Sequence, residues 1–421
     1  MRVLYIDGVG PFGGASRSLY EVLRALPREE VQKYFISARG TVLPYYSELA
    51  DDMVTVIGLT RFDNTKYSFY RGLRWIVVLR ELFHLPSTLI AISEARLRWK
   101  HIDLIHVNEI TEILPAMFAV WLFKAPVVVH VRSVARKDPD SLRCRWISGM
   151  LKNKTAAVIA IDESVRDSLP EDLPVDVIHN SFTPKYAQTP DVDFLNRLKI
   201  FDVGSFKVGF VGNLLHSKGL YDLLDAAKIL CKKGYKIDFL IVGDVARQDK
   251  GIKAWLLAKL GLAQDIKSDL AEKIEQCGLT KSFHLLGATY DIQRAYEKFD
   301  VLCFPSHYDA PGRPIFEAAF SGVPSIAAIN SPKPDTLVHM ETGLAVPPMN
   351  PQKLAEAIEY FVCNPTEAKR MGRNARDLAE VNFSPTKNAG TLLRLYRRVA
   401  GTCCRHDSSQ ISNSISNRED A

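Results

Sequence analysis

The sequence lacks three features that would place the protein in a specialised class. Its 421 residues include seven cysteines with no CxxC pair and no metal-ligand spacing, so we expect reduced thiols, no disulfide framework and no structural zinc. A membrane span needs about 20 uninterrupted apolar residues. The two best runs, 73–93 and 113–131, are interrupted by residues such as Arg80, Pro86 and Lys124. These absences argue against a disulfide-rich domain and against an integral membrane protein.

A signal peptide and a strong charge of one sign are also missing. The apolar pattern of a buried strand starts directly after Met1, in MRVLYIDG, which leaves no room for a basic segment, an apolar core and a cleavage site. The 54 Lys and Arg residues against 48 Asp and Glu residues give a net charge of only +6. We therefore expect a cytoplasmic protein and assign it no nucleic-acid partner.

The sequence does contain enough apolar material for more than one folded domain. Hydrophobic residues make up 47% of the 421 residues, which argues against disorder, and the length fits two or three domains of roughly 100 to 200 residues each. Short runs rich in Val and Ile are typical of parallel strands that helices cover on both faces. In the first part of the chain these runs lie at 3–6, 54–57, 104–107, 127–131, 156–161 and 175–178.

A second series of such runs follows a polar stretch, at 207–211, 239–242, 283–286, 301–304 and 325–328. Two consecutive series predict an α/β protein of two Rossmann-like, doubly wound domains that face a central cleft. We place the first domain at 1–183, a linker at 184–205 and the second domain at 206–384. We expect a helix at 385–400 to pack back on the first domain, and the polar tail 402–421 to be disordered.

The strongest chemical signal is the segment FPSHYDAPGRPIFEAAFSGVPSIAA, which begins at Phe304. A strand ends there and a helix opens near Ile315, so the loop between them lies at the ligand-binding end of the sheet. A helix N-terminus offers unpaired N–H groups and partial positive charge, which suit a diphosphate. Asp309 and Glu317, with seven residues between them, can contact one ligand and accept hydrogen bonds from its hydroxyls.

This segment resembles the hallmark of the retaining nucleotide-sugar glycosyltransferases of the family 4 type, which have the GT-B fold. The family pattern is Glu, seven residues and Glu, then an Ala-rich helix turn, Gly and Pro; here it is Asp309, seven residues and Glu317, then AAFSGVP. The resemblance implies that Asp309 contacts the donor sugar and Glu317 the ribose. Asp in place of Glu is one methylene shorter, which changes its reach toward the sugar. The donor-binding helix start comprises Gly312, Arg313, Pro314 and Ile315.

A second motif, VGNLLHSKGLYDLLDAA at 211–227, turns from a strand into a helix. It looks like the family element in which an Arg and a Lys hold the donor diphosphate. Lys218 matches the family lysine, whereas the Arg position is Asn213. The loss of one cation weakens neutralisation of the leaving diphosphate, and Arg313 is the candidate to replace it.

In the first domain, the strand at 3–6 leads into Gly13 and Gly14, which let backbone amides approach a ligand without an intervening side chain. The segment FGGASRSLYEVLRAL resembles the family's glycine-rich loop and first helix, which face the donor phosphates and the acceptor. An ordinary glycine turn between a strand and a helix is the alternative.

Two further strands of this domain end in polar residues. DLIHVNEITEILPA carries His106 and Asn108, and VVVHVRS carries His130 and Arg132. Family members often have a histidine on one of these loops near the reacting sugar, so the resemblance favours His130 beside the anomeric centre and places the other three on the acceptor side. A core histidine with satisfied hydrogen bonds is the alternative.

One Asp-x-Asp motif, Asp191-Val-Asp193, invites a metal assignment. It lies in the polar linker rather than after a buried strand, so we attribute it to chance. We expect no metal and no other cofactor, because the nucleotide-sugar is itself the donor substrate.

The resemblance implies transfer of a hexose-type sugar, with retention of anomeric configuration, from a nucleotide diphosphate to a glycan or lipid-linked acceptor. It points to bacterial capsule, exopolysaccharide or lipopolysaccharide synthesis, with Lys218, Asp309 and His130 as catalytic residues. In the family the departing phosphate takes the acceptor proton, so no carboxylate nucleophile is needed. The alternatives are another GT-B activity, such as a nucleotide-sugar epimerase or an inverting transferase, and a non-catalytic two-lobed sugar-binding protein.

The weak net charge is unevenly distributed. Residues 61–154 contain 16 Lys and Arg against 8 Asp and Glu, a net of +8. Basic groups interleaved with aromatic ones are typical of a membrane surface, so we predict peripheral contact of this region with an anionic inner leaflet. A soluble helix pair with solvated arginines is the alternative. The aromatic residues in question are Tyr67, Phe69, Tyr70, Trp75, Phe83 and Trp99.

Overall fold

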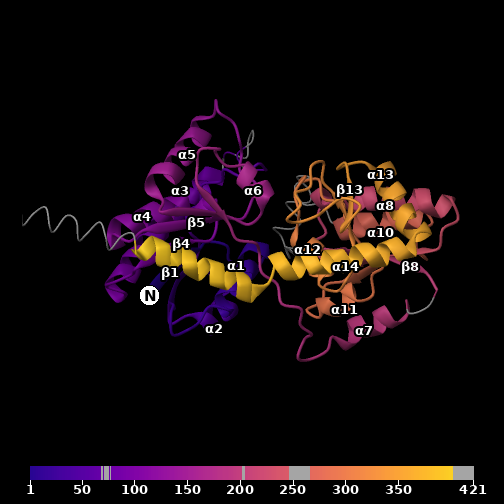
Figure 1. The fold of residues 1–421 in the computed structure, drawn as a ribbon, viewed down its shortest axis with the longest axis horizontal. Coiled ribbons are helices and arrows are strands. Elements are labelled where there is room, and N and C mark those ends of the chain that lie inside the picture. Colours follow the sequence, from indigo (N-terminus) through magenta and orange to yellow (C-terminus); the bar gives the residue numbers. More distant parts are fainter. Residues whose placement is uncertain (68–69, 71–74, 76, 202–203, 246–265, 402–421) are drawn as a thin grey trace, which may run out of the picture. The chain divides into compact units, whose positions relative to one another are not determined.

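The chain forms two compact units, each a parallel sheet between helices (Figure 1). Unit 1 comprises Met1–Thr183 and Phe383–Ala421, and unit 2 comprises Pro184–Asn382. The computed structural model describes residues 1–67, 70, 75, 77–201, 204–245 and 266–401. The expected disordered tail at 402–421, and Phe69 of the basic and aromatic region, lie outside the described residues.

The strands of unit 1 are β1 (Arg2–Asp7), β2 (Gln32–Ala38), β3 (Asp52–Val56), β4 (Leu104–Val107), β5 (Val127–Val131), β6 (Ala157–Ala160) and β7 (Val175–Val177). They form a seven-stranded sheet in the order β3-β2-β1-β4-β5-β6-β7, and every pairing is parallel. The central strands are buried along nearly their whole length, as expected for a sheet covered on both faces. The sequence analysis missed β2, in which the buried polar residues Lys33 and Ser37 interrupt the apolar run.

The helices of unit 1 are α1 (Gly14–Arg24), α2 (Leu43–Leu49), α3 (Val77–Arg98), α4 (Ile113–Phe123), α5 (Leu142–Lys154), α6 (Glu163–Asp167) and a short 3-10 turn, η2 (Ile110–Glu112). Residues of α3, α4 and α5 pack on one face of the sheet. Residues of α1, α2 and the helix at 385–401, yellow in Figure 1, pack on the other. The hydroxyl of Tyr396 on this helix lies 2.7 Å from Nδ1 of His106, so the helix at 385–401 is part of the unit 1 core.

The strands of unit 2 are β8 (Phe206–Val211), β9 (Ile237–Val242), β10 (Phe283–Gly287), β11 (Val301–Phe304), β12 (Ser325–Ala328) and β13 (Gly343–Val346). Their order is β10-β9-β8-β11-β12-β13, again with parallel pairings. The sequence analysis missed β13, a four-residue strand that begins with glycine.

The helices of unit 2 are α7 (Val192–Lys199), α8 (Leu220–Lys232), α10 (Ile266–Gln276), α11 (Ile292–Tyr296), α12 (Arg313–Ala319), α13 (Pro351–Cys363), α14 (Pro365–Asn382) and the 3-10 turn η3 (His216–Lys218). The prediction of a linker at 184–205 is wrong in its middle, where α7 packs on the sheet through the buried side chains of Phe194 and Leu198. Their spacing of four residues is the helical signal that could have revealed it.

Both sheets reverse their strand order once. In unit 1 the chain runs from β1 outward to β2 and β3 and then returns to place β4 on the other side of β1; β8 and β11 stand in the same relation in unit 2. Ligands of open α/β sheets bind at this switch point, beyond the carboxyl ends of the strands. The loops after β1 and β4, and those after β8 and β11, are therefore the places to look for functional side chains.

Candidate active site

The loops after β8 and β11 are tied together at the switch point of unit 2. The backbone N–H of His307 donates to the carbonyl of Ser217 at 3.0 Å. Gly219, which caps α8, has a φ of +72°, and a Cβ at this position would lie 1.9 Å from the carbonyl oxygen of Pro305. Because only glycine allows this approach without strain, the turn that carries Lys218 rests directly on the loop after β11.

Lys218 supplies the positive charge of this site. Its Nζ lies 5.2 Å from the ring centroid of Tyr308 and 5.6 Å from that of Phe304, within the range of cation–π attraction. In the part of the chain that the structure describes, no carboxylate pairs with this ammonium. Burial lowers the pKa of Lys218, because removal from water disfavours the charged form. An anion that bound here would stabilise the charged ammonium and so raise the pKa of Lys218 again.

The two motif acids occupy different environments. Asp309 is partly exposed and adopts a left-handed φ of +48°, and its Oδ1 accepts a hydrogen bond from the Asn330 N–H at 2.8 Å. Glu317 is only 3% exposed. Its Oε1 accepts from Nε of Arg313 at 2.8 Å and its Oε2 from the hydroxyl of Tyr296 at 2.7 Å. Asp309 is thus held on the loop surface, and Glu317 is fixed inside α12.

The ion pair of Arg313 corrects one expectation. Arg313 was the candidate to replace the cation missing at Asn213, but its guanidinium is bound to Glu317 four residues along the helix. Its charge is therefore already balanced inside unit 2, whereas Asn213 is exposed. Lys218 is also a predicted donor-side cation, and it has no carboxylate partner among the described residues.

The start of α12 is shaped by a close contact with β11. Gly312 caps the helix, and a Cβ on it would lie 2.3 Å from the ring of Phe304. Pro314 stands at the start of the helix, where its missing N–H costs no helical hydrogen bond. Ile315 is buried behind it. The predicted donor-binding segment therefore does lie at the end of β11, next to Lys218.

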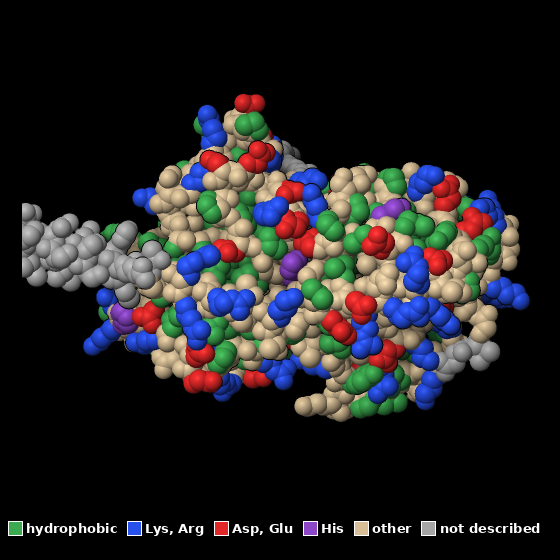
Figure 2. Space-filling view, in the orientation of Figure 1, with side chains coloured by type: hydrophobic (Ala, Val, Ile, Leu, Met, Phe, Trp, Pro, Cys, Tyr) green, Lys and Arg blue, Asp and Glu red, His purple; other side chains and the backbone are tan. Residues whose placement is uncertain are grey.

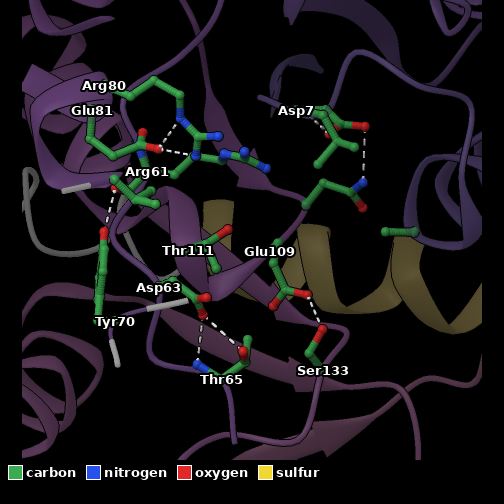
Figure 3. A pocket seen from close by; sticks show the side chains of 14 residues that line it. Asp7, Arg61, Asp63, Thr65, Tyr70, Arg80, Glu81, Glu109, Thr111 and Ser133 are labelled. Atoms are coloured by element: carbon green, nitrogen blue, oxygen red, sulfur yellow. Dashed lines mark hydrogen bonds and ion pairs between the residues drawn. The ribbon is translucent and has the colours of Figure 1, made fainter. Parts of the chain in front are cut away.

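Unit 1 contains a cavity of about 280 Å³ at its own switch point (Figure 3). Segments after β1, β3, β4 and β5 and the first turn of α3 contribute its lining. Four carboxylates and two guanidiniums face it, and Arg80 is paired with Glu81 at 2.5 Å, so negative charge is in excess. The polar lining residues are Asp7, Arg61, Asp63, Thr65, Tyr70, Arg80, Glu81, Asn108, Glu109, Thr111 and Ser133.

Asp7, the last residue of β1, organises one wall of this cavity. It is 1% exposed, and its carboxylate accepts hydrogen bonds from the Ser16 hydroxyl at 2.7 Å, from Nδ2 of Asn108 at 3.1 Å and from the hydroxyl of Tyr46. These hydrogen bonds offset part of the cost of removing the carboxylate from water. Asp7 thus holds the ends of β1 and β4 and the start of α1 in one arrangement.

Glu109 also lines the cavity, and its pKa is unusual for a carboxyl group. Its oxygens accept hydrogen bonds from the Ile110 N–H at 2.8 Å, the Ser133 hydroxyl at 2.7 Å and the Arg132 N–H at 3.3 Å. Burial nevertheless raises the pKa of Glu109 to about 7, because the desolvation of the carboxylate outweighs these donors. The group therefore exchanges a proton near neutral pH while facing the cavity.

The predicted acceptor-side residues contact one another, and Asn108 among them lines this cavity. Nε of Arg132 donates to Oδ1 of Asn108 at 2.6 Å, and its terminal nitrogens contact Oδ1 of Asn180 at 2.9 Å and Nδ1 of His130 at 3.2 Å. His106 and His130 meet edge to face, with 5.5 Å between their ring centroids. The predicted residues His106, Asn108, His130 and Arg132 thus form one connected network at the ends of β4 and β5, to which Asn180 also belongs.

The structure places His130 in the core rather than on the surface of this network. Its side chain is 2% exposed, and burial together with the charge of Arg132 lowers its pKa well below the usual range. The same two causes lower the pKa of His106 to about 3. Both rings are thus neutral, and His130 receives a hydrogen bond from Arg132 instead of facing a sugar directly. The predicted contact of His130 with the anomeric centre has no support in this geometry.

Three other predicted features can also be located. Gly13 caps α1 and Gly14 is its first residue; both are exposed, and a Cβ on Gly13 would meet nothing closer than the Pro11 carbonyl at 3.9 Å. Asp191 of the Asp-x-Asp motif caps α7 by accepting from the Phe194 N–H at 3.1 Å. Capping of α7 therefore explains the aspartate at position 191 without a metal ion.

The described residues contain neither a metal-binding cluster nor a membrane-spanning helix. No group of three or more His, Cys, Asp or Glu side chains there is arranged to hold a metal ion. None of the described helices is long and apolar enough to cross a membrane.

Two family profiles match the two units in turn. "Glycosyltransferase Family 4" matches residues 12–185, and "Glycosyl transferases group 1" matches residues 196–378. The chain belongs to the family 4 glycosyltransferases. The recognition from the motifs is confirmed, and so is the assignment of the chain as an enzyme. Lys218 and Asp309 lie in the group 1 part of this glycosyltransferase, whereas the carboxylate-lined cavity is lined by residues of the family 4 part together with Asp7 and Val9.

Curated relatives of this glycosyltransferase are distant in sequence. The capsular polysaccharide biosynthesis glycosyltransferase CapM of Staphylococcus aureus is 25% identical over 43% of this chain and 43% of its own length. The 2-deoxystreptamine N-acetyl-D-glucosaminyltransferase of Niallia circulans is 22% identical over 70% of this chain and 76% of its own length. The chain thus spans less than half of CapM and about three quarters of the second relative.

Solved structures establish the fold of the glycosyltransferase. Anabaena Alr3699/HepE in complex with UDP superposes with a TM-score of 0.71 at 20% identity, and the match covers 94% of this chain and 99% of that one. Sucrose-phosphate synthase from Thermosynechococcus elongatus gives a TM-score of 0.69 at 18% identity, over 96% and 100% of the two chains. The GT-B fold expected from the sequence is confirmed.

The sequence analysis missed most of the residues that line the cavity of unit 1. Asp7 had a readable signal, because it is a carboxylate directly after a buried strand, just as Asn108 follows β4. Arg61, Asp63 and Thr65 come from an irregular segment with no motif. Only the folded chain brings them next to β1 and β4.

Proposed function

We propose that this chain is a retaining glycosyltransferase that moves a sugar from a nucleotide-diphosphate sugar to a glycan or lipid-linked acceptor in bacterial cell-surface polysaccharide synthesis. The similarity to CapM, a glycosyltransferase of capsular polysaccharide biosynthesis, supports this acceptor class. The observation that carries the donor assignment is Lys218. Its ammonium lies among aromatic rings at the switch point of unit 2, without a paired carboxylate in the described chain.

On the donor side, each residue of the unit 2 site has a separate task. Lys218 binds the diphosphate together with backbone amides at the start of α12, which carry partial positive charge. Asp309, partly exposed on its loop, accepts hydrogen bonds from sugar hydroxyls. Glu317 accepts from the ribose, and its contacts with Arg313 and Tyr296 keep it in one orientation.

Retention follows if the acceptor hydroxyl attacks the same face of the sugar from which the diphosphate departs. A bond forms between the acceptor oxygen and the anomeric carbon, the bond to the phosphate oxygen breaks, and that phosphate oxygen takes the acceptor proton. Catalysis then depends on positioning and on stabilising the charge of the leaving diphosphate. The ammonium of Lys218 supplies the positive charge that stabilises the diphosphate, so we propose that no metal ion is required.

The assignment is tested first by a donor screen. UDP-, GDP- and ADP-sugars are added singly to the full chain, and the melting temperature is measured; the correct donor raises it because it binds the folded state. Transfer from that donor is then followed by nucleotide release, and the anomeric configuration of the product is read by NMR. An inverted product would contradict retention, and loss of activity in EDTA, restored by a divalent cation, would contradict the metal-free proposal.

A second acceptor class is favoured by one observation. The cavity of unit 1 has more carboxylates than guanidiniums, which suits an acceptor that carries ammonium groups. The name of the Niallia circulans relative, a 2-deoxystreptamine transferase, is in line with such an acceptor. Parallel transfer assays with a neutral glycan and with 2-deoxystreptamine separate the two classes. If the cavity selects ammonium groups, transfer to 2-deoxystreptamine should be lost when its amines are acetylated.

We also propose that the enzyme works at an anionic membrane surface, where a lipid-linked acceptor is reached. The excess of basic residues between 61 and 154 supports this location. The surface that would make the contact is a separate question.

A further inference from the structure

Helix α3 exposes a continuous apolar stripe. Its members recur at spacings of three, four and seven residues, which place them on one side of a helix. The exposed fractions of their side chains run from 36% to 78%. We call this surface the α3 stripe; it consists of Leu79, Leu82, Phe83, Leu89, Ile90 and Leu97.

The stripe is not the face by which α3 joins the protein. The opposite side of the helix is buried through Thr88, Ile92 and Ala95, which pack against the sheet or against Thr60. An ordinary surface helix turns its apolar side inward and its polar side to water, whereas α3 is apolar on both. The face drawn in Figure 2 shows the usual condition, with apolar and charged side chains intermingled. A contiguous exposed apolar surface of this kind marks an interaction site.

Basic side chains surround the end of the stripe. The stretch Val77–Lys100 carries four basic residues against two acidic ones. Arg96 donates through Nε to the carbonyl of Leu122 at 3.1 Å, which brings the end of α4 against α3. Lys100 and Lys124 are exposed, as is Trp121, at 69%. An apolar stripe with a basic margin and an indole nearby matches the composition of a surface that enters an anionic bilayer interface.

The same helix also forms a wall of the acceptor-side cavity. Val77, Arg80 and Glu81 line that cavity, and Glu81 accepts a hydrogen bond from the Arg61 N–H at 2.7 Å. The stripe begins at Leu79, between these residues in the sequence. A helix that lay on a membrane by its stripe would hold this cavity, on the other side of α3, about 10 Å from the apolar surface of the bilayer.

We propose that the α3 stripe docks unit 1 on an anionic bilayer and so presents the cavity to the head of a lipid-linked acceptor. The proposal rests on the proposed function for its acceptor and on the stripe for its geometry. A second copy of the chain is a poorer occupant, because stripe-to-stripe pairing would bring the basic margins of two copies together without compensating acids.

The experiment compares two triple variants of the full chain in vesicle sedimentation. The stripe variant carries Leu82→Ser, Phe83→Ser and Ile90→Ser. The matched control carries Tyr290→Ser, Met349→Ser and Val381→Ser, which remove equally exposed apolar side chains from unit 2. Vesicles consist of phosphatidylcholine alone or with about one third phosphatidylglycerol, at low salt. Circular dichroism and melting temperature verify that each variant is folded.

The proposal requires wild type to bind anionic vesicles more tightly than neutral ones. The stripe variant should lose about tenfold or more in partitioning, whereas the control stays within about twofold of wild type. Lys100→Ala and Lys124→Ala should each weaken binding to the anionic vesicles alone, by about fivefold. Equal binding of wild type and the stripe variant would overturn the proposal. So would a wild-type dimer in analytical ultracentrifugation that the stripe substitutions dissociate, because the stripe would then bind a second copy.

Failure of this proposal is distinguishable from failure of the proposed function. Transfer to a water-soluble acceptor analogue should be the same in wild type and the stripe variant, while transfer to a lipid-linked acceptor in vesicles should fall with binding. If no donor supports transfer by any variant, the proposed function fails even though the vesicle result stands.

Discussion

The two switch points of this molecule share a strand order and differ in chemistry. In unit 2 the loops after β8 and β11 present an ammonium, aromatic rings and a helix start, with Glu317 neutralised by Arg313. In unit 1 the loops after β1 and β4 present buried carboxylates around a cavity. The same doubly wound arrangement thus creates two candidate ligand-binding places, and the side chains at the strand ends determine the charge of the ligand that each would favour.

The difference also concerns how each site is kept in shape. The unit 2 site depends on close contacts at two glycines, Gly219 against the carbonyl of Pro305 and Gly312 against the ring of Phe304. The unit 1 site depends on side-chain hydrogen bonds that converge on Asp7 and Glu109 and on two neutral histidines. Unit 2 should therefore be sensitive to added bulk, and unit 1 to changes in protonation.

The largest effect is expected from removal of the unit 2 cation. Lys218→Ala should reduce the turnover number by about 10²- to 10³-fold, because the leaving diphosphate loses its main positive partner. Lys228→Ala, which removes an exposed lysine from α8, is the matched control and should leave turnover unchanged. The measurement is nucleotide release at saturating donor. Wild-type turnover in Lys218→Ala would show that the unit 2 site does not depend on this cation.

A test of the glycine contacts should give the next largest effect. Gly219→Ala forces a Cβ to within 1.9 Å of a carbonyl oxygen at a φ of +72°, so we expect a loss of about 3 kcal/mol or more in unfolding free energy. Gly234→Ala shares the positive φ but meets nothing within 4 Å, and should cost about 1 kcal/mol.

The unit 1 counterpart of this test is Gly13→Ala. Gly13 has a φ of −91° and open space around a Cβ, so the substitution should change stability by less than about 0.5 kcal/mol. Urea unfolding of the three variants gives the comparison. Equal costs at Gly219 and Gly13 would show that the two loops are not built differently.

The third prediction concerns the protonation of unit 1. The pKa of Glu109 is raised from 4.5 to about 7, so the folded state holds a proton that the unfolded state releases above about 4.5. The stability that this proton confers is complete below pH 4.5 and is lost as the pH rises to about 7. Glu109→Gln removes this dependence.

The measurement is the unfolding free energy of wild type and Glu109→Gln at pH 5 and at pH 8. Relative to the variant, wild type should lose about 1 to 3 kcal/mol between the two pH values. The difference between the proteins isolates Glu109 from His106, whose lowered pKa acts in the opposite direction as the pH falls below about 6.5. An equal change in unfolding free energy for the two proteins would mean that Glu109 stays ionised in the folded enzyme.

The smallest effect is expected from a substitution that strengthens donor binding by unit 2. Asn213→Arg supplies a cation at the position where the family has arginine, and the exposed site accepts the larger side chain. We expect the Michaelis constant for the donor to fall by about fivefold with little change in turnover. The control, Asn213→Gln, adds length without charge and should leave the constant unchanged.

The donor side of the site was largely readable from the sequence because its parts are contiguous. The loop, the helix start and the acids from Phe304 to Glu317 lie on one strand–loop–helix unit, and Lys218 lies on another. Short elements were less readable. The strands β2 and β13 and the helix α7 carry polar residues or a glycine within brief apolar patterns, so their packing partners, rather than their local pattern, define them.

The acceptor side could not be read in the same way. Its cavity joins Asp7, Arg61, Arg80 and Glu109, which are spread over about 100 positions of the chain, and no local spacing links them. Sequence reasoning favoured His130 as the group that contacts the sugar, but burial under Arg132 places it in the core. Whether a strand-end histidine faces a ligand or the core depends on what packs above it, and that is a property of the fold.

The sequence by itself determined the two-domain α/β architecture, the family and the residues of the donor motif. Periodic apolar runs and contiguous strand-end loops are local, so the chain carries that information along its own length. The tertiary structure alone decided that Arg313 is neutralised by Glu317, that the carboxylates of unit 1 converge on one cavity, and that α3 keeps an apolar stripe facing outward. Charge balance, desolvation and exposure depend on neighbours that are distant in the chain, and only folding brings them together.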